Sequence, residues 1–103
     1  MNAYIREKLP TIRACFDKYP IEKAWIFGSY ARGEEDAESD VDFLVRYKEN
    51  DGLSLLDIGG IWSELHRILD KDVDLVEDGY LLPFAVDSAN RDKILIYERE
   101  AKG

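Results

Sequence analysis

The segment from residue 24 to residue 45 constrains this chain most, because it joins a strand, a sharp turn and a second strand that bears two carboxylates. Residues 24–27 read Ala-Trp-Ile-Phe, a run that favours a β-strand. Gly28 ends the run, and a residue without a Cβ lets the backbone turn sharply and approach a ligand closely. Ser29 follows at the start of a short predicted helix, which Gly33 closes as a C-terminal glycine. Backbone N–H groups at a helix start favour an anion, so the turn predicts a phosphate site.

Two aspartates follow the turn. Asp40 and Asp42 are two residues apart, and on a strand that continues to Tyr47 both side chains project from the same face, roughly 6.5–7 Å apart. Carboxylates this close repel each other unless a cation lies between them. Because Mg²⁺ prefers oxygen ligands, the pair indicates a divalent-cation site.

In combination, these features resemble the signature of the DNA polymerase β-like nucleotidyltransferases, and most closely that of their smallest members, the minimal nucleotidyltransferase (MNT) family. The residues that carry the resemblance are, in chain order, Gly28-Ser29, Arg32-Gly33, Ser39-Asp40, Asp42 and Phe43-Leu44-Val45. The family has a third carboxylate on a later strand, and the segment Val73-Asp74-Leu75-Val76 supplies one. Its apolar neighbours predict that Asp74 is buried, which is costly for a carboxylate that is neither paired nor bound to metal. Asp72 is the rival, but it lies where this strand begins.

The resemblance implies a polymerase β-like fold and a two-metal mechanism. Asp40, Asp42 and Asp74 would hold two Mg²⁺ ions, or Mn²⁺, which clamp the attacking and leaving oxygens of an in-line displacement. Asp40 and Asp42 would bridge both ions and hold the triphosphate. Asp74 would complete the ion that activates the attacking hydroxyl, and could itself take the proton.

The nucleotide would bind at the turn. Gly28 and Ser29 would hold the β- and γ-phosphates through backbone N–H groups and the hydroxyl, and Arg32 would either assist with its charge or form a structural salt bridge. The resemblance therefore implies Mg²⁺-dependent nucleotidyl transfer, with ATP or another nucleoside triphosphate as the donor and a hydroxyl as the acceptor.

A partner protein is expected to carry that hydroxyl, because larger relatives bind the acceptor with an added domain and this chain ends where the catalytic core ends. Many MNT proteins are antitoxins of HEPN ribonuclease toxins, and some place AMP on a toxin tyrosine. The resemblance thus implies a protein adenylyltransferase in a hetero-oligomer with a HEPN-type toxin. The alternative is a non-catalytic binding module that neutralises a partner by direct contact, because Tyr30 and the acidic residues 34–36 would repel a triphosphate if they faced the site.

The composition is that of a single globular domain spanning residues 1–103. The net charge of −8 argues against direct binding of nucleic acid, which needs clustered Lys and Arg, and it favours a basic protein partner. No apolar run approaches the ~18–20 residues that span a membrane. The single cysteine, Cys15, lies in an apolar helical pattern and cannot form an internal disulfide, so we expect a packing role and a cytoplasmic location.

Apolar periodicity and turn residues predict an α/β domain with a mixed sheet of about four strands. Pro10 either kinks the first helix or marks its start, and Gly59-Gly60 either allow a close approach to the sheet or break a helix. His66 is expected to be a surface or partly packed residue rather than a catalytic one. The predicted elements, in chain order, are a helix at 3–18, a strand at 21–27, a short helix at 28–32, a strand at 40–47, a helix at 53–69, a strand at 73–76, a helix at 81–89 and a strand at 94–97.

Overall fold

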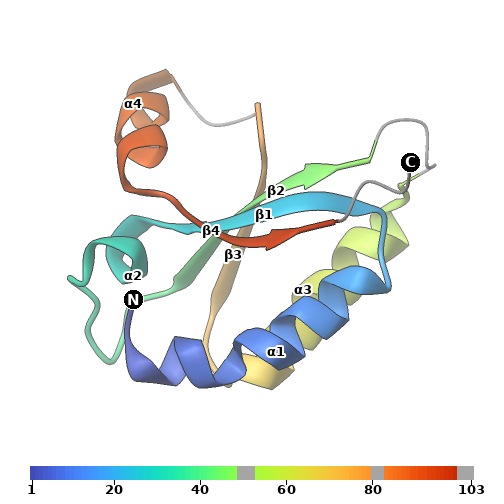
Figure 1. Ribbon diagram of the computed structural model, residues 1–103, viewed down its shortest axis with the longest axis horizontal. Coiled ribbons are helices and arrows are strands. Elements are labelled where there is room, and N and C mark those ends of the chain that lie inside the picture. Colours follow the sequence, from blue (N-terminus) through green and yellow to red (C-terminus); the bar gives the residue numbers. More distant parts are fainter. Residues whose placement is uncertain (49–52, 80–82, 100–103) are drawn as a thin grey trace.

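The computed structural model describes residues 1–48, 53–79 and 83–99, in which helices and strands alternate along the chain (Figure 1). The strands form one sheet in the order β3-β2-β1-β4, in which β1 runs antiparallel to β2 and β4, and β2 runs parallel to β3. The predicted α/β architecture with a mixed sheet is therefore confirmed. The elements are α1 (Ala3–Asp17), β1 (Ile21–Phe27), α2 (Gly28–Arg32), β2 (Val41–Tyr47), α3 (Leu55–Leu69), β3 (Val73–Glu77), α4 (Pro83–Asp92) and β4 (Ile94–Glu98).

Helices α1 and α3 lie side by side against one face of the sheet (Figure 1). Strand side chains alternate between the two faces, so Val41, Phe43 and Val45 of β2 point into this helical layer, whereas Asp42 and Leu44 point the other way. Burying each large apolar side chain stabilises the fold by roughly 1.5–3 kcal/mol, so this layer fixes the sheet and its register. The fully buried members of the layer include Ile5, Ile12 and Phe16 from α1, Ile26 from β1, and Ile61, Leu65 and Leu69 from α3.

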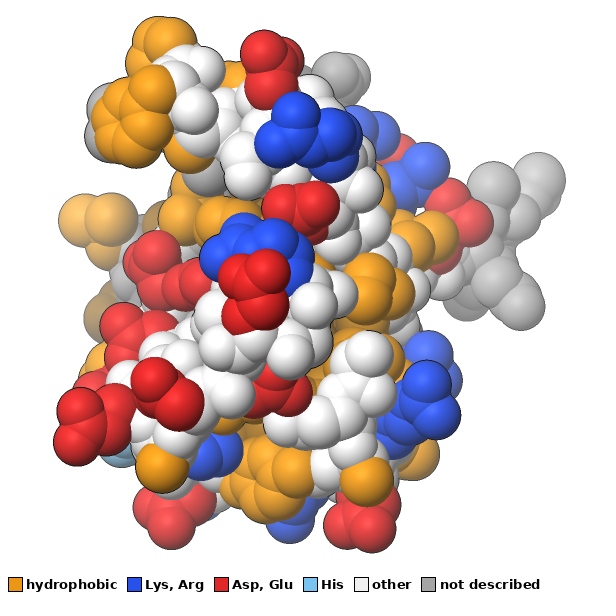
Figure 2. Space-filling view, turned by 90° about the vertical axis from the view of Figure 1, so that its left-hand side faces the viewer, with side chains coloured by type: hydrophobic (Ala, Val, Ile, Leu, Met, Phe, Trp, Pro, Cys, Tyr) orange, Lys and Arg blue, Asp and Glu red, His pale blue; other side chains and the backbone are white. Residues whose placement is uncertain are grey.

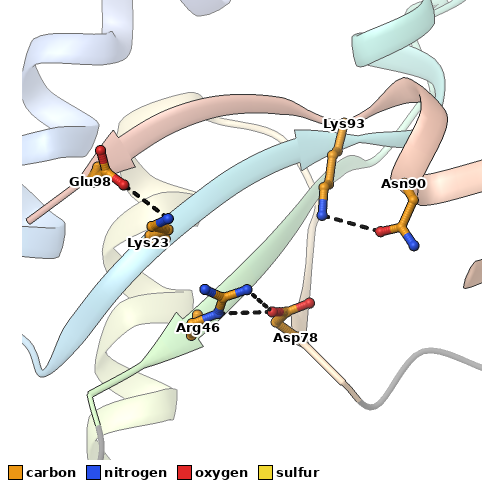
Figure 3. A network of polar contacts seen from close by, with 6 residues as sticks. All are labelled: Lys23, Arg46, Asp78, Asn90, Lys93 and Glu98. Atoms are coloured by element: carbon orange, nitrogen blue, oxygen red, sulfur yellow. Dashed lines mark hydrogen bonds and ion pairs between the residues drawn. The ribbon is translucent and has the colours of Figure 1, made fainter.

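Polar pairs between neighbouring segments stabilise the opposite face of the sheet (Figure 3). Trp25 of β1 lies on this face, because its neighbours Ala24 and Ile26 point into the core. Arg46 and Lys93 lie over its ring, 5.3 and 4.7 Å from the ring centroid. Such cation–π contacts are worth about 0.5–1 kcal/mol at exposed sites, and here they cover the aromatic ring. The pairs drawn in the figure are Lys23 with Glu98, Arg46 with Asp78, and Lys93 with Asn90.

Helix α1 runs through Pro10, so the alternative in which the helix starts at this proline is wrong. The side chain of Asn2 caps the helix by accepting a hydrogen bond from the backbone N–H of Ile5. Proline removes one backbone hydrogen bond, but core side chains on both sides of it hold the helix against the sheet. Cys15 is one of these, and burial raises the pKa of its thiol to about 11, as expected for a packing residue.

Helix α3 runs through Gly59-Gly60, so these glycines do not break it. Ser54 caps its start, which makes Leu55 the first helical residue rather than the predicted residue 53. Gly60 allows a close approach, although to Tyr19 and not to the sheet. A Cβ on Gly60 would lie 2.6 Å from the hydroxyl oxygen of Tyr19, and that hydroxyl donates a 2.7 Å hydrogen bond to Glu64.

The other boundaries differ slightly from the predicted ones. Strand β2 begins at Val41, one residue late, while β3 and β4 each extend one residue further. Helix α4 continues to Asp92, but its predicted start at 81–82 and the connection at 49–52 lie outside the described residues. In the part of the chain that the structure describes, no helix has the length and apolar character needed to cross a membrane.

The two helical glycines provide a matched test of this packing. Gly59→Ala meets nothing within 4 Å and should raise the free energy of unfolding by about 0.5–1 kcal/mol, because alanine favours helix. Gly60→Ala places its methyl group against the Tyr19 hydroxyl and should instead lower the free energy of unfolding by about 1 kcal/mol. Urea denaturation of both variants measures the difference. Equal stabilisation by both substitutions would contradict the contact.

Candidate active site

The pairing of β2 with β3 brings two carboxylates side by side. Asp42 lies opposite Asp74 in the parallel register, and residues paired in this way project from the same face of the sheet. That face is the one opposite the core, since Val41 and Phe43 point into the core. Asp72 precedes the strand, and its carbonyl oxygen accepts a 2.9 Å hydrogen bond from the backbone N–H of Val41. The structure thus brings Asp74 next to Asp42, as the sequence predicted.

The three predicted metal ligands differ in exposure. Asp42 is half-buried, whereas Asp40 and Asp74 are exposed. The expectation that Asp74 is buried is therefore wrong, because Val73 and Leu75 turn into the core and leave the aspartate on the other face. Asp40 lies one residue before β2 rather than on it.

The carboxylates act on one another electrostatically. The pKa of Asp42 is raised from an ordinary value of 3.8 to about 6, mainly by partial burial and in addition by the negative charges of Asp74 and Asp40, while the positive charge of Arg32 opposes the rise. An excess of negative charge on oxygen ligands suits a hard divalent cation such as Mg²⁺. Among the described residues, however, no three Asp, Glu, His or Cys side chains converge into a ready-made metal site. Shared binding of an ion would therefore require these carboxylates to draw closer together.

The turn at Gly28 lies directly against Asp42. Gly28 has a φ of +71°, in the left-handed region that favours glycine, and a Cβ there would lie only 2.3 Å from Oδ2 of Asp42. The glycine is therefore required for two reasons, its backbone conformation and the closeness of the carboxylate. The sequence supplied the first reason but assigned the close approach to a ligand instead of to Asp42. Ser29 follows at the start of α2 and is half-buried.

Arg32 forms two ion pairs beside this turn. Its Nε lies 3.0 Å from Glu34 and one Nη lies 3.5 Å from Asp92 at the end of α4. It also lies near enough to Asp42 to lower the pKa of that carboxyl. The salt bridge that the sequence offered as one alternative is therefore present, and the charge also acts on Asp42. No local motif points to Asp92, which is distant from Arg32 along the chain.

The residues that seemed unsuited to a triphosphate site are mostly engaged elsewhere. Tyr30 is buried in the core and does not face the carboxylates. Glu35 accepts a 2.9 Å hydrogen bond from Asn2, and Asp36 bonds within its own loop. Figure 2 shows this side of the molecule, where acidic side chains gather and few basic ones lie between them. Tyr30, Glu35 and Asp36 are therefore less of an obstacle to a triphosphate than their positions in the sequence indicated. Glu34, however, stays beside Arg32, and the surface remains acidic.

His66 takes the partly packed position that the sequence predicted. Its ring stacks on Trp62 with the centroids 5.2 Å apart and an interplanar angle of 3°. Its Nδ1 lies 2.8 Å from the carbonyl oxygen of Lys71. These contacts account for His66 as a packing residue, without a catalytic role.

Residues 10–102 match the family described as polymerase beta, nucleotidyltransferase, and the chain belongs to this family. A candidate protein adenylyltransferase of Methanocaldococcus jannaschii, MJ0435, is 41% identical over 70 residues, which are 68% of this chain and 73% of that protein. The protein adenylyltransferase MntA of Aphanizomenon flos-aquae is 31% identical over an alignment of 110 positions, which covers 91% of this chain and 73% of that protein.

Solved structures share the fold. A candidate minimal nucleotidyltransferase superposes with a TM-score of 0.74 at 30% identity, over 87% of this chain and 90% of that one. The MNT antitoxin in complex with a tri-AMPylated HEPN toxin of Shewanella oneidensis gives a TM-score of 0.65 at 19% identity, over 91% and 72% of the two chains. At 19% identity, the second comparison supports the fold alone.

The contact between Gly28 and Asp42 can be separated from the cost of a positive φ. Gly33 has a φ of +73° with nothing within 4 Å, so Gly33→Ala should lower the free energy of unfolding by only about 1–2 kcal/mol. Gly28→Ala has a similar φ and also drives a methyl group into the Asp42 carboxylate, so we expect a loss of about 2–4 kcal/mol. Guanidinium denaturation compares the two. Equal losses would mean that Asp42 does not lie against the turn.

The raised pKa of Asp42 predicts a pH-dependent stability. The folded-state pKa of about 6 exceeds the ordinary 3.8, so the folded state binds the proton more tightly and the charged form destabilises it above pH 6. Asp42→Asn should therefore be more stable than the wild type at pH 7.5, by on the order of 1 kcal/mol. This advantage should shrink as pH falls through 6 and disappear below about 4.

Thermal unfolding of both proteins between pH 4 and pH 7.5 measures the advantage. Glu38→Gln, an exposed change in the acidic loop, serves as the control and should show a much smaller trend with pH. A gap between Asp42→Asn and the wild type that stays constant over this range would refute the assigned pKa shift.

Proposed function

We propose that this chain is a protein adenylyltransferase that acts as the antitoxin of a HEPN-type toxin and transfers AMP from ATP to a hydroxyl on that partner. The observation that carries the proposal is the pairing of Asp42 with Asp74 in register, beside the turn at Gly28 and the cation of Arg32. Relatives named as protein adenylyltransferases support the reaction, and the resemblance of the sequence to the MNT family is the ground for a HEPN-type partner.

The carboxylates supply the acid–base and binding chemistry. Asp40, Asp42 and Asp74 would hold the divalent ions, Mg²⁺ or Mn²⁺, which would supply positive charge against the triphosphate and the departing pyrophosphate. Asp42 lies against the turn at Gly28 and opposite Asp74, so it joins the turn to the paired carboxylates. Asp74 accepts the proton of the attacking hydroxyl. At the same time the hydroxyl oxygen forms a bond to the α-phosphorus, and the bond between the α-phosphorus and the pyrophosphate breaks. Strand β3 is an edge strand and Asp74 is exposed, so a hydroxyl on a folded protein can reach it.

The turn binds the phosphates of ATP. The backbone N–H groups at Gly28 and Ser29 and the serine hydroxyl contact the β- and γ-phosphates, and Arg32 adds positive charge. We assign the protein to the cytoplasm, because ATP is the proposed donor and because Cys15 is a free, buried thiol that suits a reducing compartment. The net charge of −8 suits a basic protein partner rather than nucleic acid. We assign this activity to one domain that spans residues 1–103.

Neutralisation by contact alone is the second candidate, and exposed apolar side chains favour it. Leu55 and Leu56 at the start of α3 are 86% and 88% exposed, and Phe84 on α4 is 82% exposed. Apolar side chains of this size are costly to leave in water and commonly serve protein interfaces. Such contacts could mask a partner without any chemistry.

Mass spectrometry of the co-expressed partner separates the two functions. Wild type should add the mass of AMP to the partner, and Asp74→Asn should abolish the addition while the two proteins still co-purify. Asp72→Asn is the matched control, because this aspartate lies two residues away before the strand and should leave the transfer intact. A partner that stays unmodified yet is neutralised equally by the wild type and Asp74→Asn would favour masking by contact.

A further inference from the structure

Arg32 lies next to the proposed nucleotide site but is not held there by its own helix. It follows Ser29 by three residues on α2, so the two side chains lie on the same side of that helix. The side chain is 38% exposed, and a long arginine that is free in water samples many rotamers. An arginine that binds phosphate well must be held in the productive orientation before the nucleotide arrives.

Two carboxylates flank the guanidinium. Glu34 accepts a hydrogen bond from its Nε at 3.0 Å, and Asp92 forms an ion pair with one Nη at 3.5 Å. A guanidinium carries five N–H donors in a planar fork. Donors therefore remain for a third group, and a phosphate is the acceptor that this fork matches best.

The two carboxylates differ in how firmly they are fixed. Glu34 lies only two residues further along the chain and its side chain is 65% exposed. Asp92 comes from the end of α4, its side chain is 24% exposed, and it also accepts a 3.4 Å hydrogen bond from Ser88 one turn earlier. Helices α2 and α4 are in contact, so Asp92 ties Arg32 to a separate part of the fold.

We propose that Asp92 is a positioning residue for nucleotide binding, which holds one edge of the Arg32 guanidinium so that its remaining donors face the triphosphate. This inference rests on the proposed function. It makes α4 part of the nucleotide site, although the polar contacts of the Asp92 side chain among the described residues are with Arg32 and Ser88.

Calorimetric titration of the full chain with Mg²⁺–ATP tests the proposal. Asp92→Asn should raise the Kd for ATP about threefold to fivefold, because it removes the charge that holds Arg32 and keeps the size of the side chain. Asp92→Glu should recover part of the loss. Asp87→Asn, an exposed change on the same helix, should bind ATP as the wild type does. Unchanged ATP affinity in Asp92→Asn would overturn the proposal.

A double substitution separates positioning from a general effect on α4. If Asp92 acts through Arg32, then Asp92→Asn should have no further effect on ATP affinity in an Arg32→Ala background. An equal loss in both backgrounds would show that Asp92 acts by another route, such as the stability of α4, and would overturn the inference. Where an acceptor protein is available, Asp92→Asn should raise KM for ATP and change kcat less than twofold.

The same titrations separate this inference from the proposed function. If the wild type binds ATP and Asp92→Asn binds it more weakly, but the wild type transfers no AMP, the proposed transferase activity is refuted and the positioning role of Asp92 stands. A wild type that transfers AMP, with an Asp92→Asn variant of equal ATP affinity, would refute the positioning role alone. A wild type that binds no ATP would overturn both.

Discussion

The parallel pairing of β2 with β3 is the constraint on which the site depends. Side chains alternate along a strand, so a slip of one residue would turn Asp74 into the core and place Val73 or Leu75 beside Asp42. Burial of those two apolar side chains opposes such a slip. Trp62 reinforces the register, because its indole N–H donates a 3.0 Å hydrogen bond to the carbonyl oxygen of Val73. The packing of α3 therefore determines which carboxylates meet on the far side of the sheet.

This arrangement concentrates unfavourable charge at one corner of the molecule. Asp42 carries a cost because it is partly buried, lies near two other carboxylates and touches the turn at Gly28. Arg32 relieves part of that cost, but it shares its own charge with Glu34 and Asp92. The apolar layer between the sheet and the two long helices provides the stability that offsets this unfavourable charge around Asp42. A cation bound among these carboxylates would offset part of this repulsion.

Much of the fold could be predicted because its signals are local. The strand before Gly28, the glycine that closes α2 and the alternation of β2 each follow from a few neighbouring residues, and the structure has them where expected. The predicted burial of Asp74 failed because its apolar neighbours Val73 and Leu75 occupy the core face, and strand alternation then places the residue between them on the other face. The role of Gly60 could not be predicted from the sequence either, since its contact Tyr19 follows a different helix, α1. Asp92 could not be predicted either, because only the tertiary fold brings α4 to α2.

The burial of Cys15 gives this molecule an internal reporter of its own opening. The thiolate is the form that reacts with alkylating reagents, and both burial and a pKa raised to about 11 suppress it in the folded chain. Unfolding returns the thiol to water, where its pKa falls to the ordinary range and modification becomes fast. Because the sequence has one cysteine, the rate of thiol labelling measures how often the helix–sheet interface opens, and no engineered cysteine is needed. Slower labelling when nucleotide or partner is present would then measure how strongly each of them holds the core closed.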